Sequence, residues 1–156
     1  MKILFLMRHG LAPSAADAGV ESDALRPLSE RGRADARRVA QEIAKRGGRP
    51  ELVLHSPLTR AVQTAAAVAE ILKPARGTAS FAPLDNTRPA EEVFTELTAR
   101  TDGVDEVLAI GHQPQVGELA ALLTETRLDF RPAGLAVIAT GPPLRLLWIL
   151  DPGELG

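Results

Sequence analysis

The sequence has no cysteine, few histidines and no long apolar run. The absence of cysteine excludes disulfides and thiol chemistry, and it fits a cytoplasmic protein. No apolar run approaches the roughly 20 residues of a membrane span, so we expect no membrane segment. The short apolar run between Lys2 and Arg8 is too short for a signal peptide. The dispersed His9, His55 and His112 indicate neither a metal site nor a metal cofactor.

Lysine is also scarce, because fifteen of the 18 basic residues are arginines. Base composition of the genome explains most of such a bias, so only arginines at strand ends or helix starts are candidates for phosphate recognition. The net charge of −2 and the isoelectric point of about 5.9 give no reason to expect nucleic acid or an anionic membrane as a partner. We interpret residues 1–156 as one domain with a sizeable core. The oligomeric state is left open.

Apolar runs alternate along the chain with segments of helical periodicity. The expected strands are 2–7, 52–55, 79–82, 105–111, 135–140 and 144–150. The expected helices are 29–46, 56–73, 90–100 and 114–123, and residues 11–28 are expected to be a loop. This alternation predicts an α/β fold, a three-layer α/β/α domain with a mostly parallel central sheet and a hairpin at its end.

Two helices have recognisable starts and apolar faces. Ser29 is a suitable N-cap for the first, and Ser56-Pro57 for the second. The expected buried face of the first helix is Ala36, Val39, Ala40 and Ile43. The expected buried face of the second is Val62, Ala65, Ala66, Ala69 and Leu72.

The tripeptide Arg8-His9-Gly10 follows the first buried strand, and its glycine is expected to permit a sharp turn. Ligands of open α/β sheets bind at this carboxyl edge of the strands. Taken alone, the tripeptide is equally consistent with an incidental loop. Its weight comes from further segments at comparable junctions.

Arg60 lies in the first turn of the second helix, where a cation is unfavourable unless an anion meets it. His112 follows the strand 105–111 and precedes a helix, so it occupies the same kind of junction as His9. Arg26 lies before a helix start that has an ordinary structural explanation, and His55 is interpreted as structural. Two arginines and two histidines at neighbouring strand ends describe a site for a dianion, in which one histidine attacks phosphorus.

These residues resemble the motifs of the histidine phosphatase superfamily, also called phosphoglycerate-mutase-like. The resemblance is strongest to the short SixA-type phosphohistidine phosphatases. The matching stretches are LFLMRHG (4–10), RPLSERG (26–32), SPLTRAVQT (56–64) and IGHQP (110–114). They occur in family order over most of the chain, whereas the segment after Thr124 carries no motif.

The resemblance implies that His9 is the nucleophile and forms a phosphohistidine intermediate. It implies that Arg8 and Arg60 bind the phosphoryl oxygens, and that His112, as a cation, stabilises charge in the transition state. Arg26 is implied to reach the phosphate less directly. The scheme requires no metal and no cofactor.

Larger family members carry a glutamate that protonates an alkoxide leaving group, and no clear counterpart stands in 82–92. Asp85 is the nearest acid and a weak candidate for a general acid, with Glu91 as a further one. An imidazole leaving group needs little protonation, so the leading hypothesis is hydrolysis of phosphohistidine on a partner protein. Two alternatives remain: a small-molecule phosphomonoesterase of the same superfamily, or a non-catalytic phosphate-binding module.

Overall fold

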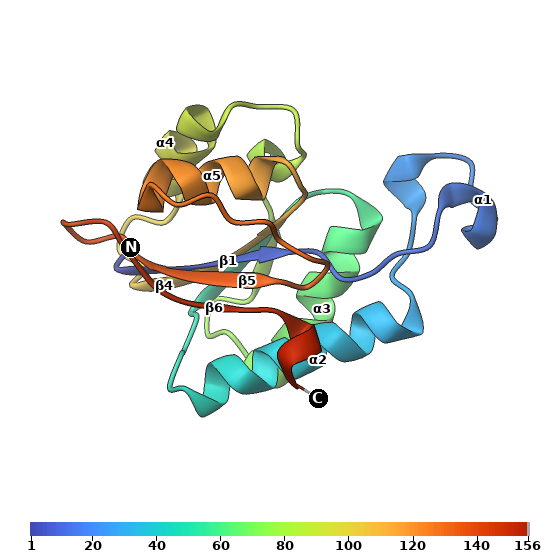
Figure 1. Ribbon diagram of the computed structural model, residues 1–156, viewed down its shortest axis with the longest axis horizontal. Coiled ribbons are helices and arrows are strands. Elements are labelled where there is room, and N and C mark those ends of the chain that lie inside the picture. Colours follow the sequence, from blue (N-terminus) through green and yellow to red (C-terminus); the bar gives the residue numbers. More distant parts are fainter. Residues whose placement is uncertain (156) are drawn as a thin grey trace.

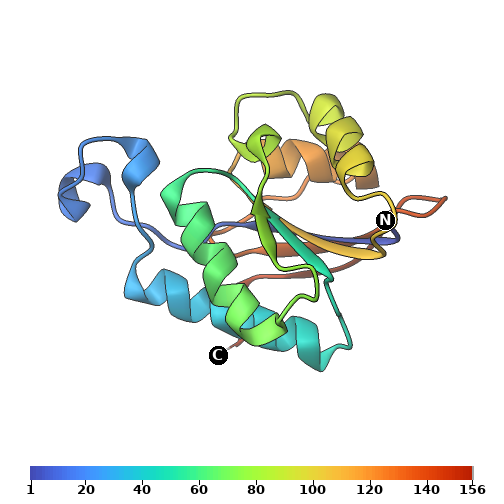
Figure 2. The same ribbon diagram turned by 180° about the vertical axis from the view of Figure 1, so that it is seen from behind.

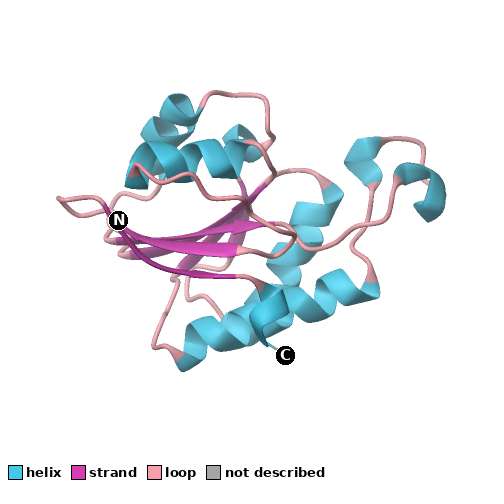
Figure 3. Ribbon diagram, in the orientation of Figure 1, coloured by secondary structure: helices cyan, strands magenta, loops and turns pink. Residues whose placement is uncertain are grey.

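The computed structural model describes residues 1–155, and their helices lie on both faces of one central sheet (Figures 1 and 3). The strands are β1 (Ile3–Arg8), β2 (Leu52–His55), β3 (Thr78–Ser80), β4 (Glu106–Gly111), β5 (Leu135–Ala139) and β6 (Arg145–Leu150). The α-helices are α1 (Ala15–Ala18), α2 (Glu30–Lys45), α3 (Thr59–Leu72), α4 (Ala90–Arg100) and α5 (Gln115–Thr124). Short 3-10 helices are η1 (Asp23–Leu25), η2 (Ala82–Leu84) and η3 (Pro152–Leu155).

The sheet has the strand order β3-β2-β4-β1-β5-β6. The first four strands of this order pair in parallel, whereas β5 is antiparallel to both β1 and β6. The expected α/β class, the mostly parallel sheet and the terminal hairpin are therefore confirmed. Because β1 is central, its two edges are occupied by different parts of the chain, β4 on one side and β5 on the other.

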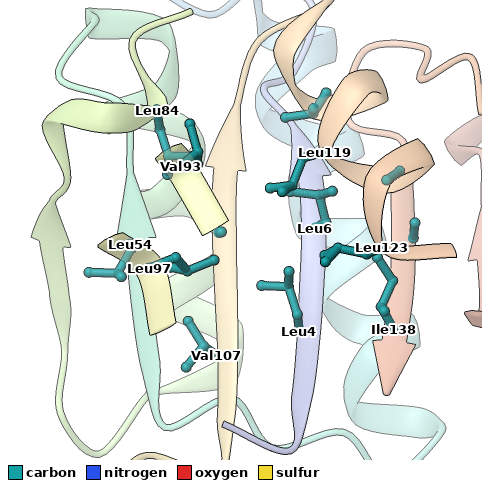
Figure 4. Packing of buried hydrophobic residues seen from close by; sticks show 14 of the residues in the cluster. Leu4, Leu6, Leu54, Leu84, Val93, Leu97, Val107, Leu119, Leu123 and Ile138 are labelled. Carbon is teal, nitrogen blue, oxygen red and sulfur yellow. The ribbon is translucent and has the colours of Figure 1, made fainter. Parts of the chain in front are cut away.

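Each face of the sheet is covered by its own pair of helices (Figures 1 and 2). Alternate residues of β1 point to opposite faces, as the period of a strand requires. Leu4 and Leu6 pack with Leu119 and Ile138 under α5, as Figure 4 shows. Phe5 and Met7 belong to the other core cluster, which contains the buried faces of α2 and α3. The sheet is thus apolar on both sides, as its near-continuous hydrophobic strands predict.

Helix α2 begins and packs as expected. The Ser29 hydroxyl accepts a hydrogen bond from the Gly32 N–H at 3.0 Å, which makes Ser29 the N-cap. The predicted stripe Ala36, Val39, Ala40 and Ile43 is buried completely.

Helix α3 begins two residues after Pro57, the expected first helical residue, and its buried face was predicted wrongly. Only Ala65 of the expected face is buried, whereas Val62 and Ala66 are exposed and Ala69 and Leu72 are half-buried. The helix begins at Thr59, and Leu58 occupies the cap position. Val62 is 41% exposed, while Ala61 and Val68 are buried against the sheet. The helix is rotated in this way because Arg60 must also turn inward, toward the end of β1, and a buried Arg60 places Ala61 rather than Val62 on the sheet side.

The segment 11–28 forms an arm that extends beyond the carboxyl edge of the sheet (Figures 1 and 2). It was expected to be a loop, but it contains the single-turn helix α1 and the 3-10 helix η1. The Ser14 hydroxyl caps α1 by accepting from the Asp17 N–H at 3.1 Å. Both turns are too short to show a helical periodicity in the sequence. The arm returns to the body at Leu28, which is buried.

In the described chain, 1–155, no helix is both long enough and apolar enough to cross a membrane.

Candidate active site

The carboxyl ends of three neighbouring strands meet at one edge of the sheet. Arg8, the last residue of β1, pairs in register with Gly111 at the end of β4. The His9 N–H donates to the Gly111 carbonyl at 3.0 Å, and the Ser56 N–H donates to the Ile110 carbonyl at 3.0 Å. Hydrogen bonds therefore join the chain segments at the carboxyl ends of β1, β2 and β4. These segments carry the candidate residues.

His9 presents an unprotonated nitrogen to the centre of this cluster. Its Nδ1 lies 2.7 Å from the Gly10 carbonyl oxygen. Since a carbonyl can only accept, Nδ1 carries the proton of the neutral ring. The Arg60 Nε–H then donates to His9 Nε2 at 3.3 Å, which requires a lone pair on Nε2. A nitrogen lone pair held in this way is the form of imidazole that acts as a nucleophile.

The surroundings of His9 keep it neutral. The pKa of His9 is lowered to about 3, mainly by burial and also by the neighbouring His112, Arg60 and Arg8. The hydrogen bond to the Gly10 carbonyl works against this shift. At pH 7 the ring is therefore uncharged, and its Nε2 is available for attack.

Arg60 connects His9 to the arm. It is 7% exposed at the start of α3. Its Nη1 donates to the Asp23 backbone carbonyl at 2.8 Å, and its Nη2 donates to the Asp23 carboxylate at 3.1 Å. These bonds use the outer end of the guanidinium, while Nε faces His9. The cation that opposes the helix dipole is thus partly compensated by a carboxylate within the protein.

Arg8 approaches the same space from the end of β1. Its Nη1 donates to the Phe130 carbonyl at 2.9 Å, and its buried Nε has no hydrogen-bond partner within residues 1–155. Burial lowers the pKa of Arg8, and the charge of Arg60 lowers it further. Two guanidinium groups that disfavour each other in this way form an environment that attracts an anion.

His112 completes the cluster. Its ring centroid lies 5.0 Å from that of His9, and its Nε2 is 2.7 Å from the Ser56 hydroxyl. Burial lowers the pKa of His112 to about 4, and the charge of Arg60 contributes, whereas Asp23 acts in the opposite direction. The ring is therefore neutral at pH 7 in these surroundings. This differs from the cationic form that the family resemblance implies, which would require an anion beside the ring.

Two side chains of α3 bind the neighbouring segments, Thr64 the turn after β1 and Gln63 the end of the arm. The Thr64 hydroxyl accepts from the Gly10 N–H at 3.0 Å and donates to the Arg60 carbonyl at 2.7 Å. The Gln63 side-chain carbonyl accepts from the Leu28 N–H at 2.8 Å. The segment 56–64 therefore supplies the Arg60 guanidinium to the site, and it also supplies the hydrogen bonds that hold Gly10 and Leu28.

Gly10 is required for a close approach rather than for a special backbone angle. A Cβ built at Gly10 would lie 2.7 Å from the carbonyl oxygen of Gly32, in the first turn of α2. Its backbone is not in the left-handed region, so the expected role of Gly10 in a sharp turn is replaced by one in packing. The turn after β1 and the start of α2 can meet only because both positions lack side chains.

The remaining predicted residues lie around this cluster. Arg26 donates to the carbonyls of Pro13 and Ala12 at 2.8 and 3.0 Å and to the Asp23 carboxylate at 2.9 Å, so it organises the arm. Asp85 accepts hydrogen bonds from the backbone and hydroxyl of Thr87, and its charge acts on His112. The roles predicted for Arg26 and Asp85 stay predictions.

His55 is buried at the end of β2, where its Nδ1 bonds to the Ser56 carbonyl at 2.8 Å. No role in the reaction follows from this contact.

Two residues at the site were missed in the sequence. Asp23 belongs to a segment without periodicity, and only its position three residues before Arg26 hinted at a contact. Ser56 was interpreted as a helix cap, which is wrong because Leu58 occupies the cap position of α3; the Ser56 hydroxyl accepts from the Leu58 N–H at 3.2 Å, before the helix begins. Its contact with His112 depends on the pairing of β2 with β4 and has no local signal.

In residues 1–155, no three histidine, cysteine, aspartate or glutamate residues form a group that could hold a metal ion. The arrangement around His9 instead offers guanidinium and imidazole groups, which bind oxyanions.

Residues 4–81 match the profile of the Histidine phosphatase superfamily (branch 1). The phosphohistidine phosphatase SixA of Escherichia coli K12 is 37% identical over 86% of this chain and 83% of its own. A protein of Picosynechococcus sp. is 32% identical over 88% of this chain and 85% of its own. A structure of the protein histidine phosphatase SixA complexed with tungstate superposes with a TM-score of 0.88, at 32% identity and over 99% of both chains.

Proposed function

The chain belongs to the histidine phosphatase superfamily, and on this basis we propose that it hydrolyses phosphohistidine on proteins through a phosphorylated His9. The observation that carries the proposal is the state of His9. Its Nδ1 proton is bound to the Gly10 carbonyl, and its Nε2 lone pair faces the Arg60 Nε–H. This is a neutral nucleophile placed beside two guanidinium groups.

In the first step, His9 Nε2 attacks the phosphorus of the substrate. The second ring nitrogen of the substrate phosphohistidine takes up one proton from solvent. A bond then forms between His9 Nε2 and phosphorus as the bond between phosphorus and the substrate nitrogen breaks, and the substrate leaves as neutral imidazole. Arg8 and Arg60 neutralise the phosphoryl oxygens, and His112 donates to one of them. Phosphoryl transfer depends mainly on such positioning and charge neutralisation.

In the second step, water attacks the phosphorus of phospho-His9. The bond between phosphorus and Nε2 breaks, inorganic phosphate leaves, and the proton released by water goes to solvent. The Gly10 carbonyl holds the Nδ1 proton in both steps, which returns His9 to the same tautomer after each cycle.

The choice of a phosphoramidate substrate is supported by the acids near the site. The hydrogen bond from Arg26 lowers the pKa of Asp23, and Arg60 adds to this, so Asp23 is ionised at pH 7 and cannot donate a proton. The Asp85 carboxylate accepts a hydrogen bond from the Thr87 N–H. An imidazole leaving group, with a pKa of about 6.5, needs less protonation than an alkoxide. The similarity to SixA proteins, one of them complexed with the oxyanion tungstate, supports the same conclusion.

The test is to trap the phosphorylated protein after rapid mixing with a protein labelled with 32P on histidine, and to map the label. We expect it on His9 and expect no label in His9→Ala. The matched control is His55→Ala, which removes another histidine that is 7% exposed, lies at the carboxyl end of a strand and bonds to the carbonyl of the next residue. This control should retain wild-type turnover. Label on any other residue would contradict the proposal.

The alternative is a small-molecule phosphomonoesterase, for which the charge of Asp85 on His112 is the favouring observation. It predicts efficient turnover of sugar or aryl phosphates that is lost in Asp85→Asn. We expect Asp85→Asn to leave phosphohistidine turnover unchanged. A protein that binds phosphate without any turnover would instead be a binding module. We also propose that the reaction needs no metal, so chelators should not reduce the rate.

A further inference from the structure

Ser56 links the β2–α3 junction to His112. Its side chain is completely buried, and its hydroxyl oxygen lies 2.7 Å from His112 Nε2. The same oxygen accepts a hydrogen bond from the Leu58 N–H at 3.2 Å. The hydroxyl therefore serves two elements at once, and only one of these contacts concerns the helix that follows.

The contact with Ser56 decides which nitrogen of His112 can meet a substrate. With Nε2 occupied, Nδ1 is the ring nitrogen that is left for a phosphoryl oxygen. The residue is only 2% exposed, and its Nδ1 has no hydrogen-bond partner in the described part of the chain. A buried polar atom in this condition is costly unless something binds to it during function.

The hydroxyl of Ser56 is able to donate to His112 Nε2, which is the arrangement that leaves a proton on Nδ1. Because the Leu58 N–H uses one lone pair of the oxygen, the hydroxyl hydrogen is free to point at His112 Nε2. A neutral imidazole that accepts at Nε2 carries its proton at Nδ1. The opposite tautomer would turn a lone pair toward the phosphoryl oxygens and repel them.

We propose that Ser56 is a positioning residue for this reaction, which holds His112 as the Nδ1–H tautomer so that Nδ1 donates to the phosphoryl group. The proposal rests on the phosphoryl transfer proposed above. A hydroxyl suits the task because it can also accept from Nε2–H when charge develops beside the ring and His112 takes up a second proton. The Ser56 contact is thus kept in both protonation states of His112.

A purely structural role for Ser56, as the residue that holds the start of α3, makes different predictions. In that case Ser56→Ala would lower the melting temperature and leave the tautomer of His112 unchanged. The experiment therefore needs a direct view of the ring nitrogens, together with a control for the loss of a buried hydroxyl. Thr101 provides this control, because it is also completely buried and donates to the Leu97 carbonyl in α4.

The first measurement is a long-range 1H–15N NMR spectrum of the histidine rings at pH 7, with and without inorganic phosphate. We expect wild type and Thr101→Val to show His112 protonated at Nδ1 and to show that proton shifted by phosphate. In Ser56→Ala we expect the Nε2–H tautomer to appear. A wild-type His112 protonated at Nε2 would overturn the proposal, even if Ser56→Ala did not fold.

The second measurement separates kcat from KM on a phosphohistidine protein. We expect kcat of Ser56→Ala to fall about 10- to 100-fold with little change in KM, less than the roughly 100- to 1,000-fold cost of removing a donor that touches the reacting group. Ser56→Thr, which restores a hydroxyl, should recover part of kcat. An unchanged kcat in Ser56→Ala would contradict the proposal. If phosphohistidine were not turned over at all, the phosphate-dependent NMR shift would still decide the role of Ser56.

Discussion

At the scale of single residues, the two site histidines are stable only in their neutral forms. Burial and nearby guanidinium groups lower the pKa of His9 to about 3 and that of His112 to about 4. In the unfolded chain both return to about 6.5. At a pH between the folded pKa values of about 3 and 4 and the unfolded value of about 6.5, the folded protein therefore binds fewer protons than the unfolded chain.

It follows that acid destabilises the fold through these two rings. Their contribution is complete above about pH 6.5 and is lost progressively as the pH falls through about 4 for His112 and about 3 for His9, with a total on the order of several kcal/mol. Chemical denaturation at pH 7, 5.5 and 4.5 measures this loss. His9→Asn should lose less stability than wild type across the same range, and an equal loss in both proteins would contradict the explanation.

The sequence identifies site residues where a local rule applies and misses them where it does not. His9, Arg60 and His112 each stand directly after a strand or in a first helical turn, and the structure brings them together. Asp23 and the contact of Ser56 with His112 depend on residues 37 and 56 positions away, respectively, and no local pattern reports such a distance.

At the scale of elements, the arm 11–28 is joined to α3 mainly by polar contacts. The Asp23 carboxylate binds Arg60 and Arg26, and the Leu28 N–H binds Gln63. Asp23 itself is largely exposed, so its ion pairs stabilise the whole protein only slightly. These ion pairs act locally, because they hold η1 in place next to Arg60.

We therefore expect Asp23→Ala to loosen the arm without changing the melting temperature appreciably. Hydrogen–deuterium exchange of residues 20–26 should become faster, while exchange in α3 stays as in wild type. Asp17→Ala is the matched control, since Asp17 is an exposed acid in α1 of the same arm. Equal exchange in the two variants would mean that Asp23 does not hold the arm.

The contact between the turn after β1 and the start of α2 makes a stronger prediction. In Gly10→Ala the new methyl group would collide with the Gly32 carbonyl, which belongs to a helix and cannot rotate away. We expect a loss of about 1–3 kcal/mol in the free energy of unfolding, and a displaced His9. Gly141→Ala is the control, because a Cβ there meets nothing within 4 Å. Equal melting temperatures for the two variants would contradict this interpretation.

The elements themselves were predictable to the extent that their sequence was periodic. The stripe of α2 and the bounds of α4 agree with the prediction. Helix α3 was shifted because Ser56 and Pro57 look like a helix start, while tertiary contacts draw Ser56 toward His112. The turns α1 and η1 are held by capping and ion pairs, which leave no hydrophobic period in the sequence.

At the scale of the whole molecule, the two core clusters share the central strand β1. Leu6→Ala would leave a cavity beside Leu119 and Ile138 and should cost about 2–5 kcal/mol. We expect a single unfolding transition and an unchanged kcat per folded molecule, because Leu6 lies below the site. Leu122→Ala, at a residue 41% exposed on α5, should change stability by no more than about 0.5 kcal/mol. Two separate transitions would instead indicate that the faces fold independently.

The fold class was predictable because strands and helices alternate, but the strand order was not. Nothing local in Leu135–Ala139 indicates that β5 lies antiparallel beside β1. That placement is decided by which apolar surfaces remain uncovered once β4 has taken the other edge.

The pairing of β1 with β5 has a consequence for the order in which the protein becomes active during synthesis. All four motifs have been translated once residue 114 has left the ribosome, yet Arg8 is not complete at that point. Its backbone N–H binds the Gly134 carbonyl, and its guanidinium binds the Phe130 carbonyl. The segment after Thr124, which carries no motif, therefore supplies the two carbonyls that hold Arg8, and we expect Arg8 to take its folded position only after residues 130–134 have been synthesised.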